Sequence, residues 1–299
     1  MRALLIILMT TCLLLALIAT SAGQAGRRPN LTDARGIVLN VSATREDDPQ
    51  KPITGQDFAV YENGIEQPIK NFTPDPSPAR IVLLVDNSLT LRADVEKLEA
   101  AAREFAYEIY EGDQLLIVGY DEQAEIVADW TDDAKKIEAS LKGFRKKGEP
   151  HLFDALKAAA DMGLSSFINA TQKRIIIVIG DGLDRVSKTN FDDILAQLQR
   201  QNITVYALQI PDRTGGALRR DQPKPVRVIE KLAEGTGGRV FPANQPQEAA
   251  KAICDELRKN RYMISYVPTG AAYGEPRRLL VVADSGINVR FKTSQPPVQ

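Results

Sequence analysis

Apolar and polar positions follow three successive patterns along the chain. The N-terminal part has the short alternating runs of β-strands, the long central part alternates apolar strand-like runs with helical periodicity, and the C-terminal part returns to strands. Strands are predicted within residues 36–72, 81–85, 115–120, 124–128, 174–179, 203–208, 261–267, 278–282 and 287–291. Helices are predicted within residues 91–109, 132–143, 152–164, 190–200, 225–234 and 246–259.

The N-terminal strands carry a hairpin signal and end at a cluster of prolines. Asn63-Gly64 separates strand-like runs at 57–62 and 65–72, and both positions of such a tight turn require a positive φ. Three prolines between Pro74 and Pro78 then interrupt the chain. The strand-rich N- and C-terminal parts are each too small to enclose a core, so we expect them to pair into one β-sandwich.

The central alternation of strands and helices predicts a doubly wound, mostly parallel α/β sheet covered by helices on both faces. We therefore expect an α/β domain at residues 79–259, inserted into a small β-sandwich built from residues 36–78 and 260–293. Residues 294–299 are predicted to form a disordered tail.

The first 22 residues have the features of a secretory signal peptide. Arg2 precedes an apolar run over residues 3–19, and small residues lead to a cleavage position after Ala22. The alternative is an uncleaved anchor, but the run is short against the roughly 20 apolar residues that span a bilayer. Cleavage would leave a flexible leader at residues 23–35 and an exported protein, periplasmic or secreted, with no membrane contact in its mature form.

Charge and cysteine content exclude some partners and some kinds of site. The chain has 38 Lys and Arg against 39 Asp and Glu, which argues against non-specific nucleic-acid binding. Of its two cysteines, Cys12 lies in the predicted signal peptide, so Cys254 would be alone after export. One cysteine excludes an internal disulfide and a cysteine zinc site, and we expect Cys254 to be a buried apolar side chain, with a disulfide between two chains as the alternative. The oligomeric state is left open.

Oxygen-bearing side chains follow two of the buried strands. Asp86, Ser88 and Thr90 come after the strand at 81–85, and Asp181 comes after the strand at 174–179. Ligands of open parallel sheets bind beyond the carboxyl ends of the strands, so these side chains are expected around one crevice. Carboxylates and hydroxyls make a hard-oxygen site suited to Mg²⁺ or Ca²⁺. The alternative is that Ser88 or Thr90 caps the next helix.

These residues resemble the metal-ion-dependent adhesion site of the von Willebrand factor type A (VWA) domain, whose first motif is Asp-x-Ser-x-Ser. The segments before and after this region make the resemblance more specific. The segment 57–64 and the motif Tyr262-x-x-Ser265-Tyr266-x-Pro268 are similar to the strands on either side of the VWA domain in exported bacterial VWFA-related proteins. The resemblance spans roughly residues 36–292.

The resemblance implies a divalent metal, usually Mg²⁺, with Mn²⁺ or Ca²⁺ as alternatives. It implies direct ligation by Ser88 and Thr90, with Asp86 and Asp181 acting mostly through water. A vacant coordination position would take an acidic group from a partner protein. The site is degenerate, because Pro150 stands where the family has a metal-binding Thr; Glu149 or an added water would have to fill that position.

Enzymatic alternatives lack their key residues. The only histidine is His151, and no Gly-x-Ser-x-Gly elbow is present for a serine hydrolase. Ser88 stands where a haloacid-dehalogenase phosphatase has its second Asp, and the glycine-rich segment 235–238 follows a predicted helix instead of a strand. We predict a non-enzymatic, exported protein-binding or adhesion module. The alternatives are a metal-free structural module and a metal-assisted phosphatase or hydrolase.

Overall fold

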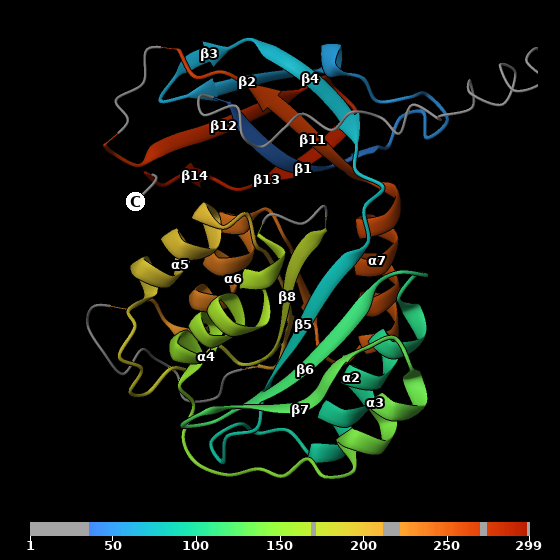
Figure 1. Cartoon of the computed structure of the whole chain (residues 1–299), viewed down its shortest axis with the longest axis vertical. Coiled ribbons are helices and arrows are strands. Elements are labelled where there is room, and N and C mark those ends of the chain that lie inside the picture. Colours follow the sequence, from blue (N-terminus) through green and yellow to red (C-terminus); the bar gives the residue numbers. More distant parts are fainter. Residues whose placement is uncertain (1–35, 169–171, 212–221, 270–273, 298–299) are drawn as a thin grey trace, which may run out of the picture. The chain divides into compact units, whose positions relative to one another are not determined.

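The computed structural model describes residues 36–168, 172–211, 222–269 and 274–297 (Figure 1). The segment Arg35–Gln299 is one compact unit. The predicted signal peptide and leader, residues 1–22 and 23–35, lie outside the described residues. No helix in the described ranges is long and apolar enough to cross a membrane.

A six-stranded sheet in the order β10-β9-β8-β5-β6-β7 forms the centre of the α/β part (Figure 1). All neighbouring strands are parallel except β7, which pairs antiparallel with β6 at one edge. The strands are β5 (Ala79–Asp86), β6 (Gln114–Tyr120), β7 (Ala124–Thr131), β8 (Lys173–Gly180), β9 (Thr204–Gln209) and β10 (Val240–Pro242).

Helices cover both faces of this sheet, as the continuous apolar strands require. On β5, Ile81 and Leu83 face one core cluster with α2 and α7, whereas Val82 and Leu84 face a second cluster with α4, α5 and α6. Cys254, as expected, is a buried side chain on α7 within the first cluster. The helices are α2 (Val95–Glu108), α3 (Ala134–Leu141), α4 (Leu152–Ala158), α5 (Phe191–Arg200), α6 (Pro225–Thr236) and α7 (Pro246–Lys259).

The N- and C-terminal strands form two small antiparallel sheets, in the orders β13-β1-β11-β4 and β14-β12-β2-β3. Their inner faces share one apolar core, in which Leu39 and Ile264 of one sheet pack with Val60 and Val281 of the other. The fold class predicted from the sequence, an α/β sheet inserted into a β-sandwich, is therefore confirmed. The strands are β1 (Ile37–Arg45), β2 (Phe58–Glu62), β3 (Ile65–Gln67), β4 (Ile69–Pro74), β11 (Arg261–Tyr266), β12 (Arg277–Ala283), β13 (Ile287–Phe291) and β14 (Ser294–Gln295).

The strands differ from the sequence prediction in three places. The strand predicted at 65–72 is divided at Pro68 into β3 and β4, which lie in different sheets; proline cannot donate to a ladder and so permits the change of partner. Strand β10 was not predicted. Ser294–Gln295 pairs with β12 as β14, contrary to the disordered tail predicted from residue 294.

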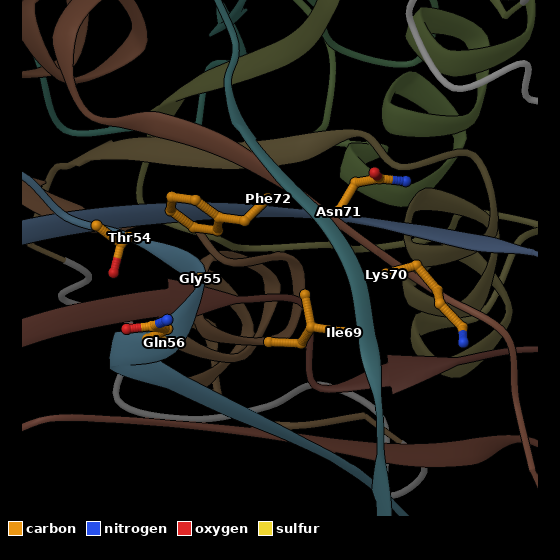
Figure 2. Close-up of a pocket in the computed structure, with 7 residues that line it drawn as sticks. All are labelled: Thr54, Gly55, Gln56, Ile69, Lys70, Asn71 and Phe72. Carbon is orange, nitrogen blue, oxygen red and sulfur yellow. The ribbon is translucent and has the colours of Figure 1, made fainter.

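A groove of about 500 Å³ lies at the edge of the sandwich, between β4 and the short 3-10 helix η1 (Gly55–Asp57) (Figure 2). Phe72 lines it and stacks on Phe58 and Tyr262, with ring centroids 5.3 Å and 5.0 Å away. Ile69 and Lys70 line its other part. The groove contains none of the predicted metal-binding residues, so it belongs to the sandwich and not to the candidate site.

Asp255 ties helix α7 to the end of α2. Its carboxylate accepts a hydrogen bond from the Tyr110 hydroxyl and forms ion pairs with Lys259 and Lys251, at 2.7 Å and 3.1 Å. Hydrogen bonds from Lys259 and then Tyr110 lower the pKa of Asp255. A depressed folded-state pKa contributes stability above the unfolded-state value, near 3.8, and this contribution is lost as the pH falls below it.

Asp255→Asn should therefore lower the free energy of unfolding at pH 7 by about 1 kcal/mol, the size expected for a partly exposed ion-pair network. Urea denaturation at neutral pH and near pH 2 measures the loss, which should shrink in acid. Glu99→Gln on α2, whose carboxylate forms no ion pair in the described part of the chain, is the matched control. An equal loss at both pH values would contradict the ion-pair explanation.

Candidate functional site

The first candidate loop begins where β5 ends. Asp86 is the last residue of β5, between β6 and β8, and both Asp86 and Ser88 are fully buried. The backbone N–H of Ser88 donates to Asp86 Oδ1 at 2.9 Å, and Ser88 Oγ lies 3.2 Å from Thr90 Oγ1. Three of the predicted oxygen-bearing side chains therefore form one hydrogen-bonded turn.

Asp181 directly follows β8, the strand that pairs in parallel with β5. Its Oδ1 accepts a hydrogen bond from the backbone N–H of Leu183 at 2.9 Å. Its carboxylate is near enough to Asp86 for its charge to raise the pKa of that group. The fold thus brings all four predicted residues to one end of the sheet, although metal binding by them remains a prediction.

Asp86 lies in an unusual environment for a carboxylate. Burial raises its pKa to about 7, with a further increase from the charge of Asp181, whereas hydrogen bonding by Ser88 and the nearness of the Tyr120 hydroxyl lower it. Within the described part of the chain, Asp86 Oδ2 and the Tyr120 hydroxyl are buried atoms with no hydrogen bond of standard geometry. The Tyr120 hydroxyl is therefore near Asp86 but not well aligned with it. One carboxylate oxygen is left for another group to bind.

Ser88 and Thr90 do not cap the next helix. Helix α2 begins at Val95, with Asp94 in the N-cap position. The prediction of a helix beginning at residue 91 was wrong, because Leu91 is buried like a helical core residue although it lies in the loop. The capping alternative is excluded, and the two hydroxyls remain available to a ligand.

Backbone hydrogen bonds join the loop that contains Pro150 to the loops around it. Its Gly148 carbonyl accepts from the Leu89 N–H at 3.0 Å, and the Pro150 carbonyl accepts from the Arg185 N–H at 2.9 Å. The His151 N–H donates to the Asp121 carbonyl at 2.9 Å. Pro150 therefore connects the loops through its backbone, and its side chain supplies no oxygen where the family has a threonine hydroxyl.

Sequence reasoning missed several polar residues that hold these loops. Asn87 donates from Nδ2 to the Arg145 carbonyl at 3.0 Å and to Asp121 at 3.3 Å. Asp184 Oδ1 accepts from the Phe153 N–H at 3.2 Å and from Ser187 Oγ at 2.5 Å. All of them follow strand ends or lie in the loops there, so the rule that locates sites at the carboxyl ends of strands could have found them.

Two glycines shape the backbone around Asp181. A Cβ on Gly180 would lie 3.0 Å from Asp86 Cβ. Gly182 has a φ of 81°, and a Cβ there would lie 2.3 Å from the Pro225 carbonyl oxygen. The sequence Gly-Asp-Gly is therefore required by the close approach of β8 to β5 and by the left-handed turn that follows.

The enzymatic alternatives gain no support from the structure. No hydrogen bond between described residues joins His151 to Ser88. The segment 235–238 ends helix α6: Gly237 is left-handed at φ 85°, and Thr236 Oγ1 accepts the Val205 N–H at 2.9 Å. Within the described ranges, no group of three or more His, Cys, Asp or Glu side chains could hold a metal ion. A metal at the candidate site would therefore depend on hydroxyl ligands.

Comparison with known proteins agrees with this fold. Residues 81–183 match the von Willebrand factor type A domain family, and the matched segment includes Asp86, Ser88, Thr90, Pro150 and Asp181. This segment of the chain is therefore similar to a VWA domain. VWA domains are generally non-catalytic modules that mediate protein–protein interactions. No curated protein matches the sequence.

Three bacterial proteins are among the solved structures that match part of this chain. An aerotolerance-related membrane protein from Bacteroides fragilis is 18% identical with a TM-score of 0.48, and the match covers 60% of this chain and 99% of that one. BatB from Bacteroides thetaiotaomicron is 17% identical with a TM-score of 0.47, covering 60% and 98%. A von Willebrand factor type A protein from Catenulispora acidiphila is 12% identical with a TM-score of 0.49, covering 81% and 74%.

Proposed function

We propose that this protein is an exported, non-enzymatic binding module that recognises a protein partner through a divalent cation, Mg²⁺ or alternatively Mn²⁺ or Ca²⁺. The cation would be held by Asp86, Ser88, Thr90 and Asp181, and the partner would supply an acidic group. Export to the periplasm or the exterior is part of the proposal and rests on the signal-peptide features of residues 1–22.

One observation carries the metal proposal. Asp86 is fully buried, has an oxygen without a hydrogen bond, and lies beside the second carboxylate of Asp181. Two nearby carboxylates in a desolvated place repel each other, and a cation between them would remove that cost. The donor set of carboxylates and hydroxyls suits a hard cation that prefers oxygen ligands.

Each residue has a distinct task in this proposal. The hydroxyls of Ser88 and Thr90 would bind the cation directly, while Asp86 and Asp181 would accept hydrogen bonds from its water ligands. Asp86 also holds the turn by accepting the Ser88 N–H, so the hydroxyls are positioned before binding. The bound cation would supply the positive charge that attracts an acidic side chain. The surrounding loops would then determine which partner fits.

Calorimetric titration tests the metal site. The purified protein, first freed of metal with a chelator, is titrated with Mg²⁺ and with Mn²⁺, and saturable heat is expected for at least one of them. Asp86→Ala should lose this heat, whereas the exposed Asp129→Ala should retain it. Equal heats for the unaltered protein and Asp86→Ala would refute the metal site.

The protein partner is tested by affinity capture from the cell envelope. The purified protein, immobilised, should retain a partner in the presence of Mg²⁺ and release it when a chelator is added. Asp86→Ala, immobilised in the same way, should fail to retain the partner even when Mg²⁺ is present. Retention that is insensitive to both changes would show that binding does not use the candidate site.

A metal-free structural module is the second candidate, and the position of Pro150 favours it. The Pro150 carbonyl already joins two loops, and its side chain offers no ligand. Pro150→Thr should restore the missing hydroxyl and raise the Mg²⁺ affinity about tenfold, or ~1.4 kcal/mol. Calorimetry compares this variant with Pro150→Ala, which opens the same space without a ligand. An equal affinity for both variants would contradict a role for this position in metal binding.

A further inference from the structure

We propose that the open edge of β4 in the sandwich is a second interaction surface, which binds an extended segment of a partner protein as an added strand. The segment alternates aliphatic and acidic residues: its aliphatic side chains enter the groove beside Phe72, and its acidic side chains lie next to Lys70. This inference goes beyond the proposed function, because it uses neither the cation nor the residues that would hold it.

Strand β4 has a partner strand on one side only. It lies at the edge of the sheet β13-β1-β11-β4 and pairs antiparallel with β11 (Figure 1). The Asp75 N–H, which continues this ladder, donates to the Arg261 carbonyl at 2.8 Å. Because hydrogen bonding alternates along an antiparallel strand, Thr73 also bonds towards β11, whereas the N–H and C=O of Phe72 point away from it. No described residue forms a hydrogen bond with these two groups, so they are open to an added strand.

The groove of about 500 Å³ runs along this open edge. It is lined by four consecutive residues of β4, Ile69, Lys70, Asn71 and Phe72. Figure 2 shows Ile69 and Phe72 on the side of the strand that faces η1, and Lys70 and Asn71 on the other side. A space that side chains from both sides of a strand line must follow the edge of that strand.

The side of the groove towards η1 is apolar and already ordered. Phe72 stacks between Phe58 and Tyr262, so an aliphatic side chain placed beside it would extend the core of the sandwich. The backbone N–H and hydroxyl of Thr54 both donate to the carboxylate of Asp57, at 2.6 Å and 2.9 Å, and hold η1 in place. A preformed groove loses little conformational entropy when a ligand binds.

Lys70 determines the charge that the groove accepts. It is the one charged side chain among the seven residues that line the groove, it is exposed, and it forms no ion pair with a described residue. A second copy of β4 paired along this short edge would bring two such lysines close together, and an exposed lysine on an edge strand discourages that pairing. An acidic side chain on the added strand would be attracted instead, so the occupant is a different, acidic segment.

These features together define the occupant. Pairing with the N–H and C=O of Phe72 requires an extended backbone, and alternate side chains of that backbone point to opposite sides. One set would contact Ile69 and Phe72, and the other set would lie beside Lys70. Exposed sheet edges bind extended peptides in this way, with the main chain contributing affinity and the side-chain pockets contributing specificity.

Synthetic peptides added to the full-length protein test this surface, with a chelator present so that no cation takes part. The acidic probe is Thr-Val-Asp-Val-Asp-Val-Thr with both ends blocked, and the basic probe has lysine in place of both aspartates. Amide chemical shifts at residues 54–56 and 69–73 should change saturably. The acidic probe should bind about fivefold more tightly than the basic probe, the size expected when an exposed charge pair replaces a like-charge contact.

Two changes test the charge and the strand pairing separately. Lys70→Glu should reverse the preference, so that the basic probe binds more tightly, and the exposed side chain makes a loss of folding unexpected. Lys135→Glu, which alters an exposed lysine on α3, is the matched control and should keep the original preference. Methylating the backbone nitrogen of the acidic probe at the central valine, or at the aspartate after it, should abolish binding in one case only, because alternate N–H groups face β4.

Several results would overturn the proposal. No saturable shift with either probe up to about 10 mM, or equal affinity of both probes for the unaltered protein, would contradict an acidic occupant at this edge. Equal affinity of the two methylated probes would contradict the strand pairing. Shifts at residues 69–73 that depend on protein concentration without any peptide would show that a second copy occupies the edge instead.

Discussion

Asp86→Asn is expected to stabilise the metal-free protein at pH 8 by about 3 kcal/mol and, at the same time, to abolish Mg²⁺ binding. Burial, and then Asp181, raise the pKa of Asp86 to about 7 from an ordinary value of 3.8. A difference of one in pKa between the folded and unfolded states changes the free energy of unfolding by about 1.4 kcal/mol. The two values for Asp86 would give a total of roughly 4 kcal/mol, and partial relaxation of the site reduces it to about 3 kcal/mol. A residue that destabilises the fold it belongs to is typical of a functional site.

The sign of the pH dependence makes this prediction specific. A carboxyl whose pKa is raised in the folded state stabilises the fold when protonated, and that stabilisation is lost as the pH rises through about 7. The advantage of Asp86→Asn should therefore be small near pH 4 and grow towards pH 8. Urea denaturation in the presence of a chelator measures it, with the exposed Asp129→Asn as control. A variant less stable than the unaltered protein at pH 8 would contradict the argument.

Saturating Mg²⁺ should make the unaltered protein more stable than Asp86→Asn, the reverse of their order without the metal. A ligand that binds only the folded state stabilises it by an amount that grows with its concentration, about 4.1 kcal/mol at one thousand times the dissociation constant, which exceeds the advantage of about 3 kcal/mol expected for Asp86→Asn. The unaltered protein gains this stabilisation, while Asp86→Asn should gain none. The two proteins measured with and without Mg²⁺ therefore separate the cost of the carboxylate from its proposed use.

Gly238→Ala is expected to lower the free energy of unfolding by about 4 kcal/mol or more, which places it among the most damaging single substitutions. A Cβ on Gly238 would lie 1.9 Å from the Val205 carbonyl oxygen and 2.7 Å from its carbonyl carbon. Both are backbone atoms of β9 inside the central sheet, so neither can move aside as a side chain would. The end of α6 would have to separate from the sheet.

Thermal and urea denaturation measure this loss directly. Gly143→Ala is the matched control, because its added Cβ would meet only the Ser140 carbonyl at 3.5 Å, an ordinary contact distance. The control should change stability by no more than about 0.5 kcal/mol. A Gly238→Ala protein with near-normal stability would show that the turn can shift away from β9 at little cost.

The Gly238 contact also explains the glycine-rich segment 235–238. The sequence alone showed only that this segment follows a predicted helix instead of a strand. Residues 235–238 are rich in glycine because Gly237 ends α6 in the left-handed conformation and Gly238 lies against β9. Neither requirement is local to the segment. Composition shows that glycine is present, but only the position of the neighbouring strand shows whether it serves a ligand or the packing of the backbone.

Much of the fold could be predicted because hydrophobic periodicity records burial directly. The continuous apolar runs of β5 and β8 indicated strands covered on both faces, and the structure confirms both their burial and their parallel pairing. The division of β3 from β4 at Pro68 and the pairing of Ser294–Gln295 with β12 were not predictable in this way. Both depend on which partner strand is available, and a short segment carries no record of its partner.

The candidate site, like the fold, was predictable from the sequence only in part. Residue types and their positions after two buried strands were enough to select Asp86, Ser88, Thr90 and Asp181, because parallel strands end at a common edge. The sequence alone also identified Pro150 as a departure from the VWA pattern. Only the tertiary structure decided that Ser88 and Thr90 do not cap α2, that Asp86 has a buried oxygen without a hydrogen bond, and that Leu89, between Ser88 and Thr90, is exposed. Hydrogen-bond alignment and solvent exposure depend on distances between residues far apart in the chain, which packing alone determines.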